Sequence, residues 1–279
     1  MSKAVVMGNG ESRSWYNPNT KWADVRTWGC NAVYRDAAPD NLVAMDNAMK
    51  YEIHASGYPK QNKCWFSSWH VVDSMVIPII KSDCGVPEYF IHENENKTEL
   101  CVLNEYKSNT LKDLVDDTLK QYPNYSMDEV HSHLISKNWR YKDAGYWISY
   151  VSEKDNIESV EEDFQSAGCA ALSLACREGA REVYMLGFDM QNSDSLYRGT
   201  SGYVSDDINF GNETSLLSGW AKCMSSVFDQ YKEATFYWVD CQITSSNGWH
   251  GSSVRDYHSN VKLLSKEEFC KELLLNDYK

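Results

Sequence analysis

A short apolar run that stops at two glycines, close to the start of the chain, constrains the fold more than any other feature. The run is Ala4-Val5-Val6-Met7, and Gly8-Asn9-Gly10-Glu11-Ser12 follows it directly. A β-branched run that ends in a glycine pair is typical of the first strand of an α/β domain, where backbone N–H groups of a tight turn face an anionic ligand. The sequence therefore predicts that a nucleotide binds at this turn.

Length and composition predict one large domain. The chain has 279 residues, of which 42% are hydrophobic and 13% aromatic, so it can bury a sizeable core. The first apolar run begins at residue 4, so we expect no leader before it, and no apolar stretch approaches the roughly 18 residues that a membrane helix needs. We therefore expect no transmembrane segment and a cytoplasmic location.

The charge disfavours nucleic-acid binding, and the cysteine pattern argues against a zinc site. The formal net charge of −13 disfavours the binding of nucleic acid through its phosphates, whereas a small ligand or a neutral glycan fits it better. The nine cysteines are scattered and form no CxxC pair. We therefore expect reduced thiols and no metal site.

Further apolar runs have the spacing of a parallel sheet. The segments 29–34, 42–45 and 64–69 are short and apolar, and a helix is expected at 47–55, between the last two. The range 71–145 breaks this pattern, and we expect it to be a helical insertion.

The regular pattern resumes at residue 166. Small residues at helical spacing predict a helix over 166–180, and 182–189 is typical of a strand. The polar, glycine-punctuated range 190–215 is typical of a lid loop. Three elements complete the prediction: a helix at 216–231, a strand at 235–239 and a helix at 266–275. The expected fold is a single α/β domain with a Rossmann-like, mainly parallel sheet.

Polar side chains follow several of the predicted strands. In an open parallel sheet, ligands bind at the carboxyl ends of the strands, in the crevice where the strand order reverses. The third glycine of the dinucleotide fingerprint is absent, because Arg13 stands at its position, so NAD is disfavoured. The candidate nucleotide-binding residues at these strand ends are Gly8, Asn9, Gly10, Ser12, Asn31, Asp46, Asn47, Gly187 and Asp189.

Four short motifs occur in an order that resembles a known family. They are Gly8-Asn9-Gly10-x-Ser12, Cys30-Asn31, Ser166-x-Gly168 and Gly187-x-Asp189-Met190. Together they resemble the bacterial sialyltransferases of glycosyltransferase family 42, and also related Rossmann-like proteins of pterin-diphosphokinase type. The resemblance to the sialyltransferases implies one α/β domain with a lid. It also implies a cytidine monophosphate sugar as the donor substrate, with no cofactor.

The same resemblance implies roles for individual residues. Asn9 and Asn31 would contact the phosphate and ribose of the donor, and Ser166 and Gly168 would contact its ribose or sugar. The base-side floor of the pocket would be formed by Gly187 and Asp189.

The chemistry of transfer needs two further groups. Tyr197 resembles a tyrosine that hydrogen-bonds the leaving phosphate, and it fits equally well as an aromatic anchor of the lid. Residues 190–249 contain no histidine, so the proton acceptor has to come from elsewhere. The candidates are His250, His258, Asp206 and Asp207.

The sequence therefore favours a nucleotide-sugar-dependent glycosyltransferase that acts on a glycan or a small acceptor. Two other functions stay open. One is a nucleotide-binding protein without transferase activity, and the other is an ATP-dependent transferase similar to a pterin diphosphokinase. The sequence carries no signal for the oligomeric state.

Overall fold

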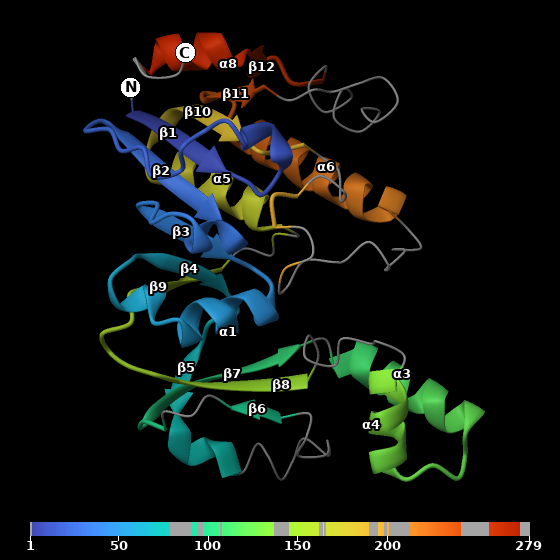
Figure 1. Ribbon diagram of the computed structural model, residues 1–279. Coiled ribbons are helices and arrows are strands. Elements are labelled where there is room, and N and C mark those ends of the chain that lie inside the picture. The colour runs from blue at the N-terminus through green and yellow to red at the C-terminus, as the bar shows by residue number, and fades with distance from the viewer. Residues whose placement is uncertain are drawn as a thin grey trace.

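An eight-stranded parallel sheet forms the centre of the protein (Figure 1). The computed structural model describes residues 2–78, 91–93, 97–106, 108–136, 145–161, 164, 166–189, 195–197, 200, 213–240 and 257–273. The strand order is β12-β11-β10-β1-β2-β3-β4-β9, and every neighbouring pair is parallel. The strands are β1 (Ser2–Met7), β2 (Val25–Cys30), β3 (Asn41–Ala44), β4 (Cys64–Ser67), β9 (Ile157–Val160), β10 (Ala180–Leu186), β11 (Thr235–Val239) and β12 (Val261–Leu264). The predicted fold class is confirmed.

Both faces of this sheet are buried, because each strand alternates its side chains between two cores. In β1, Ala4 and Val6 belong to one core, whereas Val5 and Met7 belong to the other. The first core is covered by α5 (Ala167–Arg177) and α6 (Glu213–Gln230). The second is covered by α1 (Asn47–Ala55) and α8 (Lys266–Glu272).

Helix α5 lies close to the sheet because its side chains are small. Nine of its eleven residues are buried, and they are alanines, cysteines, leucines and a serine. The helix packs on β1, β2, β3 and β10. The helix is capped by Glu178 and followed by a left-handed glycine, Gly179, with a φ of 99°.

A second, four-stranded sheet lies between β4 and β9 in the chain. Its order is β5-β7-β8-β6, with β5 (Val71–Asp73), β6 (Ile91–Glu93), β7 (Leu100–Tyr106) and β8 (Gly145–Val151). Between β7 and β8 the chain forms a pair of helices, α3 (Ser108–Gln121) and α4 (Met127–Ser136). Figure 1 shows this part beyond the β4–β9 edge of the first sheet. The range 71–145, expected to be helical, thus contains strands as well as helices.

Some boundaries differ from the sequence prediction. The second strand begins earlier, at Val25, and the chain turns at Asn31 into a short 3₁₀ helix, η2 (Asn31–Arg35). The strand expected at 182–189 stops at Leu186, before the glycine. Most of the expected lid, 190–215, lies outside the described residues.

Candidate functional site

The strand order reverses between β1 and β10. From β1 the chain adds β2, β3 and β4 on one side of the sheet, and β10, β11 and β12 stand on the other side. Since the strands are parallel, the carboxyl ends of β10, β1, β2 and β3 lie next to each other along one edge. The structure therefore brings the glycine turn together with Asn31, Asp46 and Gly187-Phe188-Asp189. We call this edge of the first sheet the carboxyl edge.

The glycine turn packs against the end of β10. The Gly8 N–H donates to the Leu186 carbonyl at 2.8 Å, and the Gly10 N–H donates to the Gly187 carbonyl at 3.0 Å. A Cβ at Gly8 would lie 2.5 Å from the Gly187 carbonyl oxygen, and a Cβ at Gly10 would overlap the Asp189 carboxylate. Both glycines are therefore required by this close approach. Because their N–H groups already have acceptors, the expectation that these two groups face the ligand is wrong.

Asp189 holds the residues that follow the turn. Its Oδ2 accepts a hydrogen bond from the Ser12 N–H at 2.9 Å, at the start of the 3₁₀ helix η1 (Glu11–Arg13). The adjacent Phe188 carbonyl accepts one from the Trp238 indole at 2.9 Å. The segment after β10 is thus fixed to both neighbouring parts of the sheet.

Arg13 is a residue of the site that the sequence did not reveal. It stands where the third glycine was expected and is only 2% exposed. Its Nε donates to the Gly8 carbonyl at 2.6 Å, and its Nη2 donates to the Tyr197 hydroxyl at 2.9 Å. The guanidinium thus places a buried positive charge directly behind the glycine turn. No local sequence pattern indicates that an arginine beside the glycine turn is buried, so the sequence alone could not identify this residue.

Tyr197 lies beside Arg13 rather than in an open lid. The residue is 5% exposed, and its hydroxyl donates to Asp36 Oδ2 at 2.5 Å. Burial, reinforced by the hydrogen bond to Asp36 and opposed by Arg13, raises the pKa of Tyr197 to about 12. The phenol therefore keeps its proton at neutral pH. This geometry supports the lid-anchor interpretation of Tyr197.

Asn31 and Asp46 meet at the ends of β2 and β3. The Asn31 side chain donates to Asp46 Oδ2 at 3.3 Å. Asp46 precedes helix α1, but it makes no capping hydrogen bond, and the next residue, Asn47, is 7% exposed. Among the described residues, the buried Asn31 Oδ1 and Ser12 Oγ have no hydrogen-bond partner. Such atoms are rare in folded proteins, and a ligand at this edge can satisfy them.

The backbone is strained at the same edge. The residue directly after the strand has a positive φ in β2, β4 and β11, at Asn31 (48°), Ser68 (50°) and Asp240 (50°). Such a conformation costs a non-glycine residue about 1–3 kcal/mol and is concentrated at ligand sites. Asp240 is also a carboxylate whose pKa is raised by burial and by Glu267.

The amino end of α5 reaches this edge. The Cys169 N–H donates to the Ser166 hydroxyl at 3.2 Å, so Ser166 caps the helix. A Cβ at Gly168 would lie 2.9 Å from the Phe188 ring, which fixes the first turn of α5 against the end of β10. The first N–H groups of a helix have no partner within it and carry its positive pole. Ser166 and Gly168 therefore form the electropositive end of α5 at the carboxyl edge.

Lys50 is a second charged residue that the sequence did not indicate. It lies on α1 and is 1% exposed, and its Nζ donates to the Ser67 carbonyl at 2.7 Å. Burial, opposed by the charge of Asp46, lowers the pKa of Lys50 to about 8. A buried cation thus lies behind the ends of β3 and β4.

Among the described residues, none of the candidate proton acceptors lies at this edge. His250, Asp206 and Asp207 lie outside them. His258 is described, and it lies three residues before β12, with its Nδ1 3.6 Å from Asp229 on α6. Because the strand starts after it, His258 lies at the amino edge of the sheet, and its assignment as a site base is wrong.

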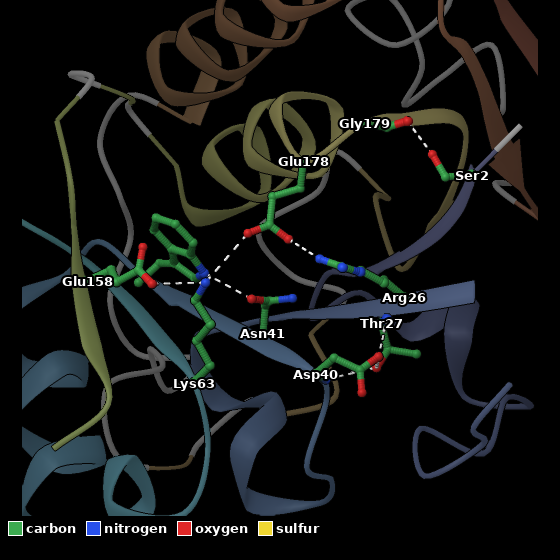
Figure 2. Close-up of polar contacts among 10 residues, drawn as sticks. Ser2, Arg26, Thr27, Asp40, Asn41, Lys63, Glu158, Glu178 and Gly179 are labelled. Atoms are coloured by element: carbon green, nitrogen blue, oxygen red, sulfur yellow. Dashed lines mark hydrogen bonds and ion pairs between the residues drawn. The ribbon is translucent and has the colours of Figure 1, made fainter. Parts of the chain in front are cut away.

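The amino edge carries a different kind of polar network (Figure 2). Glu178 forms ion pairs with Arg26 and with Lys63, and Lys63 Nζ also lies 2.9 Å from Glu158. A pocket of about 440 Å³ opens here, between the starts of β1 and β2 and the end of α5. It lies at the opposite end of the strands from the glycine turn.

Within the described part of the chain, no helix has the length and apolarity needed to cross a bilayer. No model of a known protein family matches the chain, and no curated protein matches its sequence.

The chain is similar to solved structures of sialyltransferases. One is CstII from Campylobacter jejuni in complex with cytidine-5′-monophosphate, at 14% identity and a TM-score of 0.37, covering 88% of this chain and 82% of that one. Another is the monofunctional α-2,3-sialyltransferase Cst-I from Campylobacter jejuni, at 11% identity and a TM-score of 0.33, covering 88% and 78%.

Proposed function

We propose that the protein binds a nucleotide-sugar at the carboxyl edge of its parallel sheet and transfers the sugar to an acceptor hydroxyl. The observation that carries this proposal is the reversal of strand order between β1 and β10. At that point, polar residues that follow four neighbouring strands lie along one edge of the sheet. Open α/β sheets bind nucleotides in this position.

The groups at this edge suit the parts of such a donor. The electropositive first turn of α5, with Ser166 and Gly168, suits the phosphate. Asn31 and Asp46 offer an amide and a carboxylate, which suit the hydroxyls of a ribose or sugar ring. The buried charge of Arg13 adds a positive field behind the turn without a metal.

Transfer breaks the bond between the anomeric carbon and the phosphate oxygen, which keeps the electron pair. The acceptor oxygen forms the new bond to that carbon, and its proton passes to a base. Candidates for the base are His250 and Asp206, and from the structure Asp240, whose raised pKa makes it a better proton acceptor than an ordinary aspartate. Tyr197, if it leaves Asp36, would donate to the departing phosphate.

A thermal-shift panel tests ligand binding. Cytidine, uridine, adenosine and guanosine nucleotides and nucleotide-sugars are compared with and without magnesium. We expect a nucleotide-sugar to raise the melting temperature without magnesium, by an amount that grows with its concentration. A shift only with ATP and magnesium would instead support the diphosphokinase-like alternative.

The position of the site is tested by paired variants. Asn9→Leu puts a bulky side chain into the glycine turn and should abolish the shift. Asn124→Leu makes the same chemical change in the exposed turn between α3 and α4, and should leave the shift unchanged. An unchanged shift in Asn9→Leu would remove the glycine turn from the site.

A nucleotide-binding protein without transferase activity is the second candidate. The observation that favours it is the Tyr197 hydroxyl, which is already bonded to Arg13 and Asp36. Incubation of a bound nucleotide-sugar with the protein, followed by chromatography, separates the two. Release of the free nucleotide supports the transferase, and an intact donor supports the binding protein.

A further inference from the structure

Arg35 joins three segments of the chain beside the carboxyl edge. It is the last residue of η2, the 3₁₀ helix that begins at Asn31. Its Nε and Nη2 both donate to Oε1 of Glu52 on α1, the Nε at 2.8 Å. Its Nη1 donates to the Thr200 hydroxyl at 2.7 Å. One guanidinium therefore connects η2 to α1 and to residue 200, and the transfer proposed above assigns it no role.

The contact between Arg35 and Glu52 is more restrictive than an exposed ion pair. The two side chains are 21% and 27% exposed. The Tyr34 hydroxyl donates at 2.5 Å to the same carboxylate oxygen that accepts from Arg35. Burial, together with the hydrogen bond to Glu52, raises the pKa of Tyr34 to about 12, so the phenol remains a donor at neutral pH. Because an arginine with several directed hydrogen bonds fixes orientation as well as distance, this contact can hold η2 in one position on α1.

The same two elements meet again at the ligand site. Asn31, at the start of η2, donates to Asp46, at the start of α1, over a long 3.3 Å. Arg35 and Glu52 lie four and six residues further along the chain. These lengths correspond to about 8 Å of 3₁₀ helix and about 9 Å of α-helix, so the two elements are joined at both ends of a nearly equal span. The Arg35 contact therefore limits how far η2 can turn relative to α1, and with it the separation of Asn31 and Asp46.

Asn31 depends on such support. Its φ of 48° is a strained conformation, which persists only where the surrounding structure holds it. Its Nδ2 donates to Asp46, and its buried Oδ1 has no partner among the described residues. A rotation of η2 would turn this oxygen away from a ligand hydroxyl.

We propose that Arg35 is a positioning residue, which together with Glu52 holds Asn31 and Asp46 at the separation that the hydroxyls of the ligand require. This inference rests on the proposed function, since it takes these two side chains to be part of the nucleotide-sugar site.

A second contact extends this role to Tyr197. The N–H and the hydroxyl of Thr200 donate to the Tyr197 carbonyl at 3.0 and 2.6 Å. The Arg35 guanidinium also lies 6.0 Å from the centre of the Tyr197 ring. Arg35 therefore holds the segment that carries Tyr197 as well as the pair at the ends of β2 and β3.

The first measurement needs no ligand. In isotope-labelled protein, the side-chain amide NMR signal of Asn31 is the one that is missing from Asn31→Asp. We expect Arg35→Lys to shift this signal, because a lysine has one terminal nitrogen and cannot keep the paired bonds to Glu52 together with the bond to Thr200. Glu52→Gln weakens the same contact from the other side and should shift the signal too.

The second measurement is the affinity of the folded protein, by calorimetry well below the melting temperature, for the best-binding nucleotide-sugar of the panel. We expect the dissociation constant to rise about tenfold in Arg35→Lys, since misplaced binding groups lose much of their contribution. Glu52→Gln should change it in the same direction. A merely structural arginine would lower the melting temperature and leave the dissociation constant of the folded protein unchanged.

Arg26→Lys is the matched control. It makes the same exchange in the ion pair with Glu178 at the amino edge, and it should change neither the Asn31 signal nor the affinity. An Asn31 signal that stays in place in Arg35→Lys overturns the inference, and so does a shifted signal with an unchanged dissociation constant. If the wild type binds no nucleotide-sugar, the proposed function fails instead, and a shifted Asn31 signal still shows that Arg35 holds the pair.

Discussion

At the carboxyl edge of the parallel sheet two cations, Arg13 and Lys50, are buried, whereas at the amino edge the cations lie in ion pairs that are partly open to solvent. Arg13 and Lys50 are at most 2% exposed, and the backbone beside them adopts positive φ at Asn31. At the amino edge, the Arg26 side chain is 65% exposed in its ion pair with Glu178. A fold tolerates buried charge and strain where function requires them. The contrast therefore marks the carboxyl edge as the functional one, although a pocket opens at the other.

The largest effect is expected from Arg13→Leu. The change leaves the Gly8 carbonyl and the Tyr197 hydroxyl without their buried donor. The free energy of unfolding should fall by about 3–5 kcal/mol, the range for breaking a buried charged interaction. Urea unfolding of the wild type and the variant measures it. A loss no larger than that of an exposed arginine would contradict the contrast between the edges.

The second effect is a pH dependence that arises from Lys50. Its folded pKa of about 8 lies below its ordinary value of 10.5, so between these values the folded state binds fewer protons than the unfolded state. The contribution of Lys50 to the free energy of unfolding therefore rises with pH between these two values, by at most about 3 kcal/mol.

The measurement for Lys50 is a difference between two proteins. Buried thiols such as Cys30, whose pKa burial raises to about 12, make stability fall with rising pH above about 9. Subtracting the unfolding free energy of Lys50→Met from that of the wild type, at each pH, removes their contribution. A difference that stays flat from pH 7 to 10.5 would show that burial does not lower the pKa of Lys50.

A smaller loss is expected from Tyr197→Phe. The variant keeps the buried ring and removes only the hydroxyl that links Arg13 to Asp36. We expect a loss of about 1–2 kcal/mol in urea unfolding, since the Arg13 donor stays buried without its acceptor. Nucleotide release from a bound donor should persist if Tyr197 is only an anchor. A full loss of release with little loss of stability would instead assign it to the chemistry.

The smallest effect is expected at the amino edge. Arg26→Gln removes the exposed ion pair with Glu178, and we expect a loss of no more than about 1 kcal/mol, decreasing further with added salt. Urea unfolding at low and high salt measures it. A loss as large as that of Arg13→Leu would mean that the two edges do not differ.

Local patterns were enough to predict much of the sheet. The helix at 47–55 and the strand at 235–239 match α1 and β11, because their patterns of apolar residues reflect their burial directly. The sequence also indicated where four strands end, at Gly8, Asn31, Asp46 and Gly187. Because the strands are parallel, these ends lie along one edge of the sheet.

Long-range pairing explains what local patterns missed. Arg13 is buried because it meets Tyr197, 184 residues later in the chain. In the second sheet, β7 pairs with β8 across the helices α3 and α4, so its strands have no short-range signal. Lys50 has the sequence of an ordinary exposed helical lysine, and only the packing of α1 on β3 and β4 buries it.

Hydrogen–deuterium exchange with the best-binding nucleotide of the panel tests the location of the site most directly. We expect slower exchange at residues 8–13, 31–36 and 166–170, on the carboxyl edge, and no change at residues 22–26 and 178–180, on the amino edge. Slower exchange confined to the amino edge would place the ligand in the 440 Å³ pocket and contradict the proposed site.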